Sequence, residues 1–274
     1  MPDLEKVADH YTHGGLLGAI EAGLTALGKA TGAVSIEDLA AVDEFHIGGR
    51  QASLEFLEQL GLSAKDRVID VGCGLGGAAR LVAQRYGSRV SGIDLTEEYV
   101  ATGRTLCAWT GLAERVDLQQ GSALETSFAD GSFDAGYMLH VGMNIAEKPA
   151  LYREIRRVLS LGARFGVYDV MRCNAGELAF PVPWATTPAE SAVAGVEDYL
   201  GALEDAGFRI IAQRNRRDFA LAFFAQLRAR AASGPPPLGL HILLGATAGA
   251  KIQNMVANIA NGLIAPVEVI AEAV

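Results

Sequence analysis

Apolar residues recur along this chain in short continuous runs and in stretches of helical spacing, and the two kinds alternate. The short runs predict buried strands, at residues 67–71, 89–93, 116–120, 133–139 and 164–170. The stretches of helical spacing predict helices, at residues 52–60, 77–86, 96–110 and 148–159. Because strands that alternate with helices are joined by parallel crossovers, we expect a doubly wound α/β sheet.

The alternation becomes less regular after Pro181. The sequence FPVPWATTP at 180–188 predicts a proline-rich loop, which we expect to lie over the site. Beyond this loop the pattern predicts helices and strands at 196–206, 208–213, 218–232, 247–262 and 265–270. The run GPPP at 234–237 separates the helices 218–232 and 247–262, which we expect to form a lid and a candidate homodimer contact.

The composition is that of a globular protein, because 50% of the 274 residues are hydrophobic and 20% are charged. The formal net charge of -9 would repel a nucleic-acid backbone, so we expect no nucleic-acid partner. The three cysteines form no CxxC pair, which favours a reducing cytoplasmic location over a disulfide framework or a metal site. The acidic start is unlike a signal peptide, and no apolar run reaches the roughly 20 residues of a membrane span.

The strongest local signal is VIDVGCGLGG at 68–77, between a predicted strand and a predicted helix. Gly72, Gly74 and Gly77 satisfy GxGxxG, which lets backbone approach a ligand at a helix N-terminus. Asp70 precedes this turn, where a carboxylate would repel a dinucleotide pyrophosphate and attract a cationic sulfonium ligand with an amino group. Asp94 ends the second strand, where it can accept hydrogen bonds from ribose hydroxyls.

At these residues the sequence resembles the class I S-adenosylmethionine-dependent methyltransferases, over about 67–170. The resemblance implies an α/β Rossmann-like sheet of seven strands whose last strand, 265–270, is antiparallel, with N-terminal helices and a helical lid insertion. We therefore expect one domain over 1–274. A helical cap at 1–60 precedes a cofactor-binding core at 61–170, and 171–274 carries the substrate-side loop, the lid and the last strands.

The resemblance also implies which residues hold S-adenosylmethionine. Asp70, Gly72, Cys73 and Gly74 would surround its methionine part, and Asp94 with Leu95 its ribose. Ser122 and Ala123 would face the adenine, although many members of the family have Asp in place of Ser122. Leu139 ends the fourth strand beside the cofactor. In similar enzymes the N-terminal helices close the pocket. The candidates for this role here are Tyr11, His46, Gly48 and Gly49.

The acceptor segment is MLHVGMNI at 138–145. It lacks the Asn/Asp-Pro-Pro-aromatic and Pro-Cys motifs of nucleic-acid methyltransferases, and the chain lacks the two-glutamate pattern of protein arginine methyltransferases. The chain is instead similar to the sarcosine and dimethylglycine, ubiquinone-type and tocopherol-type methyltransferases. It is therefore predicted to transfer a methyl group to N, O or C of a small molecule by in-line displacement, releasing S-adenosylhomocysteine.

His140 is the candidate catalytic residue, as a base or as a group that orients the acceptor, because histidine titrates near neutral pH. The alternative is a histidine that satisfies a backbone carbonyl. Asp169 is a candidate for holding a cationic acceptor, and Trp184 with Phe180 for walling the pocket. Three methionines near the same strand ends suit an apolar wall, which favours a hydrophobic or aromatic acceptor. They are Met138, Met143 and Met171.

Two other functions stay open at this stage. A regulatory protein that binds the cofactor without turnover would share the same motifs. A nicotinamide-dependent oxidoreductase would share the glycines and Asp94. A short-chain reductase is disfavoured, because the chain has no Tyr-x-x-x-Lys and Tyr152 has Arg156 at that spacing.

Overall fold

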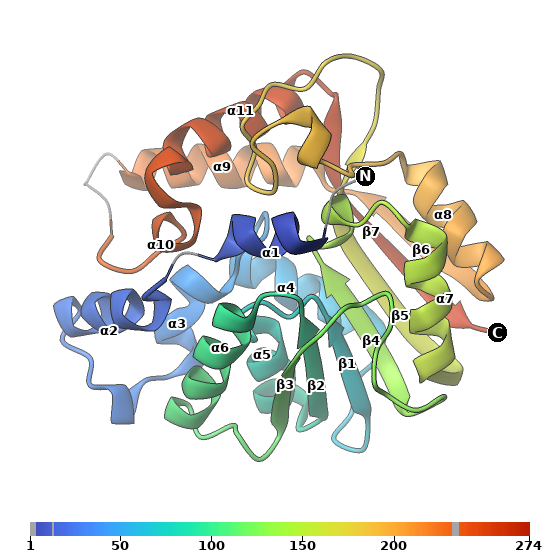
Figure 1. The fold of residues 1–274 in the computed structure, drawn as a ribbon, viewed down its shortest axis with the longest axis horizontal. Helices are drawn as coiled ribbons and strands as arrows, with labels where there is room; N and C mark the ends of the chain where they lie inside the picture. Colours follow the sequence, from blue (N-terminus) through green and yellow to red (C-terminus); the bar gives the residue numbers. More distant parts are fainter. Residues whose placement is uncertain (1–3, 13, 232–235) are drawn as a thin grey trace.

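A computed structural model describes residues 4–12, 14–231 and 236–274. It contains a seven-stranded sheet built from β1 (Arg67–Val71), β2 (Arg89–Asp94), β3 (Val116–Gln120), β4 (Phe133–Leu139), β5 (Leu159–Arg172), β6 (Phe208–Asn215) and β7 (Ile264–Ala273). The strand order is β3-β2-β1-β4-β5-β7-β6 (Figure 1). The first five strands pair in parallel and β7 is antiparallel to both β5 and β6, as the predicted fold class requires.

The helices lie close to the predicted boundaries. In chain order they are α1 (Leu4–Tyr11), α2 (Leu16–Ala26), α3 (Ile36–Asp43), α4 (Gly49–Leu57), α5 (Gly77–Tyr86), α6 (Glu97–Trp109), α7 (Lys148–Val158), α8 (Val196–Asp205), α9 (Arg217–Ala231), α10 (His241–Leu244) and α11 (Ala248–Ala260). The predicted end of one helix at 232 and the glycine and first proline of GPPP fall outside the described residues. No helix of the described ranges has the length and apolarity that crossing a membrane requires.

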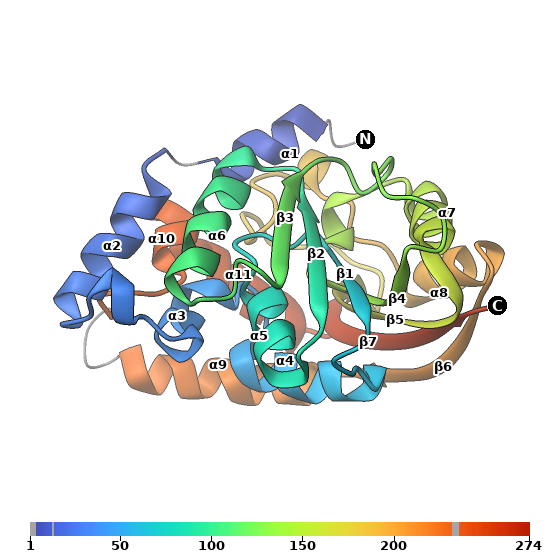
Figure 2. The same ribbon diagram turned by 90° about the horizontal axis from the view of Figure 1, so that it is seen from below.

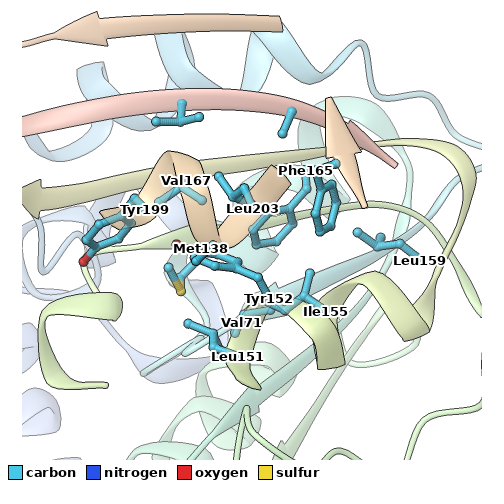
Figure 3. Close-up of a cluster of buried hydrophobic side chains, with 14 of the residues drawn as sticks. Val71, Met138, Leu151, Tyr152, Ile155, Leu159, Phe165, Val167, Tyr199 and Leu203 are labelled. Atoms are coloured by element: carbon cyan, nitrogen blue, oxygen red, sulfur yellow. The ribbon is translucent and has the colours of Figure 1, made fainter. Parts of the chain in front are cut away.

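Each face of the sheet is covered by its own set of helices. On one face, α7 and α8 pack against the strands through a cluster that includes Tyr152, Tyr199 and Phe165, each fully buried (Figure 3). On the other face, α4, α5 and α6 contribute Phe56, Val82 and Val100 to a second cluster. This arrangement explains why the central strands are nearly continuous apolar runs, since both of their faces are buried.

The remaining helices lie outside these two layers. Helices α2 and α3 lie at the opposite end of the molecule from α7 and α8 in both views (Figure 1, Figure 2). Helices α9 and α11 lie at the top of Figure 1 and contact each other, and α10 contacts α11. Asn258 of α11 exchanges two hydrogen bonds with the backbone of Ala179, at 2.9 and 3.0 Å. Asn254 of the same helix donates to the carbonyl of Pro181 at 3.0 Å, so the proline-rich loop is joined to α11.

Candidate functional site

The glycine-rich turn after β1 is tied to the end of β2 by its backbone. The amides of Gly72 and Cys73 both donate to the carbonyl of Ile93, at 2.8 and 3.0 Å. Gly72 has a φ of 72°, which a side chain rarely adopts. A Cβ atom at this position would also collide with the side chain of Val141, which follows β4. The turn therefore needs glycine for its conformation and for its contact with the next strand end.

Two buried aspartates flank this turn. Asp94 accepts hydrogen bonds from the amides of Gly74 and Thr96, at 2.8 and 2.9 Å. Asp70 accepts one from the Tyr137 hydroxyl at 3.0 Å. Burial raises the pKa of both carboxyls, that of Asp70 to about 7. Two carboxylates that share one desolvated space attract a cationic ligand.

A cavity that opens to solvent lies between this turn and the C-terminal helices. On one side, which we call the acidic half, it is lined by the predicted cofactor residues Asp70, Gly72, Cys73, Gly74, Asp94, Leu95, Ser122, Ala123 and Leu139. On the other side, which we call the lid half, it is lined by side chains of the proline-rich loop, α9, α10 and α11. The structure thus brings together nine predicted residues that stand far apart in the sequence.

Helix α1 closes part of the mouth of the cavity. Tyr11, at its last position, lines the cavity and donates a hydrogen bond to Oδ1 of Asn144 at 3.2 Å. His10 lies with Nε2 at 3.0 Å from the carbonyl of Pro183 in the proline-rich loop. Burial raises the pKa of the Tyr11 hydroxyl, so this group is a neutral donor at physiological pH. The predicted closing position of Tyr11 agrees with this geometry.

Gly48 does not lie on the cavity wall, which corrects its predicted place in the pocket. It is the N-cap of α4 with a φ of 94°, and a Cβ atom there would collide with the ring of Phe219. Gly49 begins the helix and is likewise outside the wall. His46 does line the cavity, with Nε2 at 3.0 Å from the Ser53 hydroxyl. The two glycines therefore shape the start of α4.

His140 lines the cavity, but both of its ring nitrogens face backbone groups. Nδ1 lies 3.1 Å from the carbonyl of Tyr168, and Nε2 accepts a long hydrogen bond from the amide of Ile47 at 3.4 Å. Burial, with the neighbouring His46, lowers the pKa of His140 to about 3. The predicted role as a base does not fit a neutral ring with both nitrogens engaged. The geometry fits the alternative, a histidine that satisfies backbone.

The other acceptor candidates divide between wall and core. Trp184 and Met143 line the cavity. Asp169 does not, because it is fully buried and accepts a hydrogen bond from the Tyr199 hydroxyl at 2.8 Å. Phe180 packs against a separate apolar cluster. Met138 and Met171 lie in the hydrophobic core. The hypothesis that Asp169 contacts the acceptor is therefore not supported by its position.

Sequence analysis missed two polar residues that organise the segment after β4. Asn144 receives the hydrogen bond from Tyr11, and its amide nitrogen donates to the carbonyl of Val141 at 3.2 Å. The buried ammonium of Lys148 donates to the carbonyls of Gly142, Ile145 and Ala192, at 2.8, 2.5 and 3.1 Å. A lysine at the start of a predicted helix was the available signal for the second residue. Nothing local distinguished Asn144.

Comparisons with known proteins agree with this geometry. Residues 68–162 match the family model described as a methyltransferase domain. A probable chloroplastic tocopherol O-methyltransferase of Oryza sativa subsp. japonica is 40% identical over 97 residues, which is 35% of this chain and 27% of that protein. The chain thus spans about a quarter of that relative's length.

Two solved structures share the fold. A phosphoethanolamine N-methyltransferase 2 of Haemonchus contortus superposes with a TM-score of 0.76 at 18% identity, covering 100% of this chain and 60% of that one. The [4+2]-cyclase SpnF superposes with a TM-score of 0.65 at 21% identity, covering 94% and 95%. Residues 68–162 therefore match a methyltransferase domain, as the motifs predict, and the likeness to the two solved structures shows that the fold is shared.

Proposed function

We propose that this protein is an S-adenosylmethionine-dependent methyltransferase that acts on a small-molecule acceptor. The observation that carries the proposal is the acidic half of the cavity, where Asp70 and Asp94 flank a turn whose glycines, Gly72 and Gly74, line the cavity. None of the described residues that line the cavity is Lys or Arg. This charge distribution favours a sulfonium cation and disfavours the pyrophosphate of a nicotinamide cofactor.

The residues of the acidic half suit the parts of this cofactor. Asp70 would hold the amino group of the methionine part, and the backbone of the turn at 72–74 would pack against that part. Asp94 would accept hydrogen bonds from the ribose hydroxyls, beside those that it already accepts from the amides of Gly74 and Thr96. Leu95, Ser122 and Ala123 would lie at the adenine. When bound, the cofactor supplies a methyl group on a sulfonium, already activated for transfer.

The chain's own contribution is then to align the acceptor and keep water out. Tyr11 and Asn144 tie α1 across the mouth of the cavity. His140 acts as a positioning residue, because it joins the carbonyl of Tyr168 on β5 to the amide of Ile47 ahead of α4. Transfer to a nucleophile that needs no prior deprotonation requires no further group from the wall.

We further propose a cytoplasmic location and no nucleic-acid partner. The location is supported by three free cysteines, Cys73, Cys107 and Cys173, and the second point by the net charge of -9. Helices α9 and α11 remain the candidate surface for a homodimer. Size-exclusion chromatography with light scattering tests that surface directly.

The experiment that tests the main proposal is calorimetry of the purified protein with S-adenosylmethionine, S-adenosylhomocysteine and NADPH. We expect micromolar binding of the first two compounds and none of NADPH. Binding of NADPH alone would overturn the proposal in favour of an oxidoreductase. Because one protein of this fold is a [4+2]-cyclase, methyl transfer itself needs a turnover assay, and cofactor binding without any turnover would favour the regulatory alternative.

A further inference from the structure

The lid half of the cavity differs from the acidic half in having an almost purely apolar wall. Its side chains come from three helices that the cofactor motifs do not include, namely Phe223, Phe224, Leu227, Leu243, Ile252 and Met255. The proline-rich loop adds the indole of Trp184, whose Nε1 donates a hydrogen bond to the Ser191 hydroxyl at 2.9 Å. The indole face is therefore available to an apolar molecule.

The charged groups on the rest of the wall are all acidic, and some are already paired. Asp43 forms an ion pair with Arg80 at 2.7 Å, and Glu44 forms one with Arg50 at 2.7 Å. These two arginines stand behind the wall and do not line the cavity. Burial lowers the pKa of His46 and of His140, so neither ring carries a positive charge at neutral pH.

An anionic acceptor would therefore lose its hydration without gaining a cation. Transfer of an ionised group from water is costly unless a partner of opposite charge replaces the water. The nearest lysine of the lid, Lys251, precedes the wall residue Ile252 but is not itself on the wall. It is 7% exposed, and burial lowers the pKa of its ammonium, an effect that the nearby Glu190 opposes.

We propose that the acceptor is a bulky, uncharged hydrophobic molecule and that the lid half rejects acceptors bearing a phosphate, diphosphate or carboxylate. The inference rests on the proposed function, because the lid half is an acceptor site only if the acidic half holds the cofactor. It separates this chain from methyl transfer to phosphorylated or amino-acid acceptors. The specificity determinant is the set of six apolar side chains, in a wall whose described residues include no lysine or arginine.

The test is calorimetry of the full chain saturated with S-adenosylhomocysteine, with 4-butylphenol, 4-octylphenol and 4-octylphenyl phosphate as probes. We expect 4-octylphenol to bind at least about tenfold more tightly than its phosphate, because the phosphate loses its hydration without gaining a cationic partner. Affinity should rise by up to about fourfold per added methylene between the two phenols. Equal or tighter binding of the phosphate would overturn the inference.

A matched pair of variants locates the determinant. Leu227 lines the cavity and is 38% exposed, and Ile211 on β6 is 44% exposed and lies outside the wall. Leu227→Arg should reduce the ratio of the affinities for 4-octylphenol and for its phosphate by about tenfold, because it places a cation on the wall. Ile211→Arg should leave this ratio unchanged. An unchanged ratio in both variants would overturn the inference.

A Lys251→Met variant tests whether Lys251 supplies a cation to the acceptor. If the wild-type protein prefers the phosphate and Lys251→Met removes that preference, Lys251 reaches the acceptor and the acceptor is anionic, which contradicts the inference. Binding of S-adenosylhomocysteine alone is measured first in every case. Its absence would sink the proposed function, whereas its presence without binding of either phenol would sink only the acceptor inference.

Discussion

The two halves of the cavity are built in different ways. The acidic half consists of strand ends joined by backbone hydrogen bonds, such as those from Gly72 and Cys73 to Ile93 and from Gly74 to Asp94. The lid half consists of helices and a loop held mainly by apolar packing, with a few amide contacts from Asn254 and Asn258. A backbone-linked half tolerates little change, whereas an apolar wall can be repacked.

This difference assigns cofactor binding to the acidic half and the choice of acceptor to the lid half. Substitutions in the acidic half should abolish cofactor binding and, through it, every later step. Substitutions in the lid half should leave cofactor binding intact and change which acceptor is used. Each prediction below would break this division if the effect appeared in the wrong half.

The largest effect is expected for Gly72→Ala. The left-handed φ costs about 1–2 kcal/mol with a side chain, and the collision with Val141 costs roughly 1–3 kcal/mol more. Affinity for S-adenosylhomocysteine should fall by about 100-fold. Gly111→Ala is the control, because Gly111 has a φ of 70° with open space around it. A similar loss of affinity in both variants would show that the turn contact is irrelevant.

The next effect concerns charge. Asp70→Asn should weaken cofactor binding by roughly 30-fold at pH 8, because a hydrogen bond to a charged group is worth about 1.5–3 kcal/mol. Burial raises the pKa of Asp70 to about 7 without ligand, so a cationic ligand that needs the ionised form should bind more tightly as the pH rises from 5.5 to 7.5.

Calorimetry across this pH range checks both parts of that prediction. The rise in affinity should be lost in Asp70→Asn and kept in Asp117→Asn, since Asp117 is exposed on β3. A pH dependence that survives in Asp70→Asn would assign the titration to another group.

A smaller effect is expected at the junction of the two halves. His140 has a φ of 54°, which asparagine tolerates better than most residues, so His140→Asn should fold. Loss of its two backbone contacts should lower kcat by about tenfold. The pH profile of kcat should keep its shape. If kcat instead fell by 100-fold or more and its pH profile no longer declined at low pH, His140 would be assigned the role of a base.

Stability gives an independent reading of the same variant. Because the folded pKa of His140, about 3, lies below its ordinary value of 6.5, protonation opposes folding. The wild-type protein should therefore lose this share of its stability as the pH falls from 6.5 toward 3. Chemical denaturation should show a shallower loss in His140→Asn.

The smallest effect is expected for Tyr11→Phe. One hydrogen bond to Asn144 is worth about 1 kcal/mol, so S-adenosylhomocysteine should dissociate about fivefold faster. Tyr86→Phe is the matched control, because the Tyr86 hydroxyl has no hydrogen-bond partner in the described part of the chain. Stopped-flow measurements that gave the same rate for both variants would remove the closing role of α1.

The acidic half could be predicted from the sequence because its residues occupy short motifs at the ends of successive strands. Parallel pairing of β1, β2 and β4 must place Asp70, Asp94 and Leu139 at one edge of the sheet. Gly48 was misplaced because a glycine's need for a positive φ leaves the same local pattern in a pocket and at a helix start. The role predicted for His140 depended on two backbone partners that no local pattern reveals.

The order of strands and helices and the acidic half follow from the periodicity and contiguous motifs of the chain, and the antiparallel last strand followed from the resemblance to the methyltransferase family. The tertiary structure decided which residues face the lid half, the pairing of Tyr11 with Asn144 and the engagement of both His140 nitrogens. These hydrogen bonds join residues 28 to 133 positions apart. Their partners are chosen by packing of distant segments, which leaves no periodic signal in the chain.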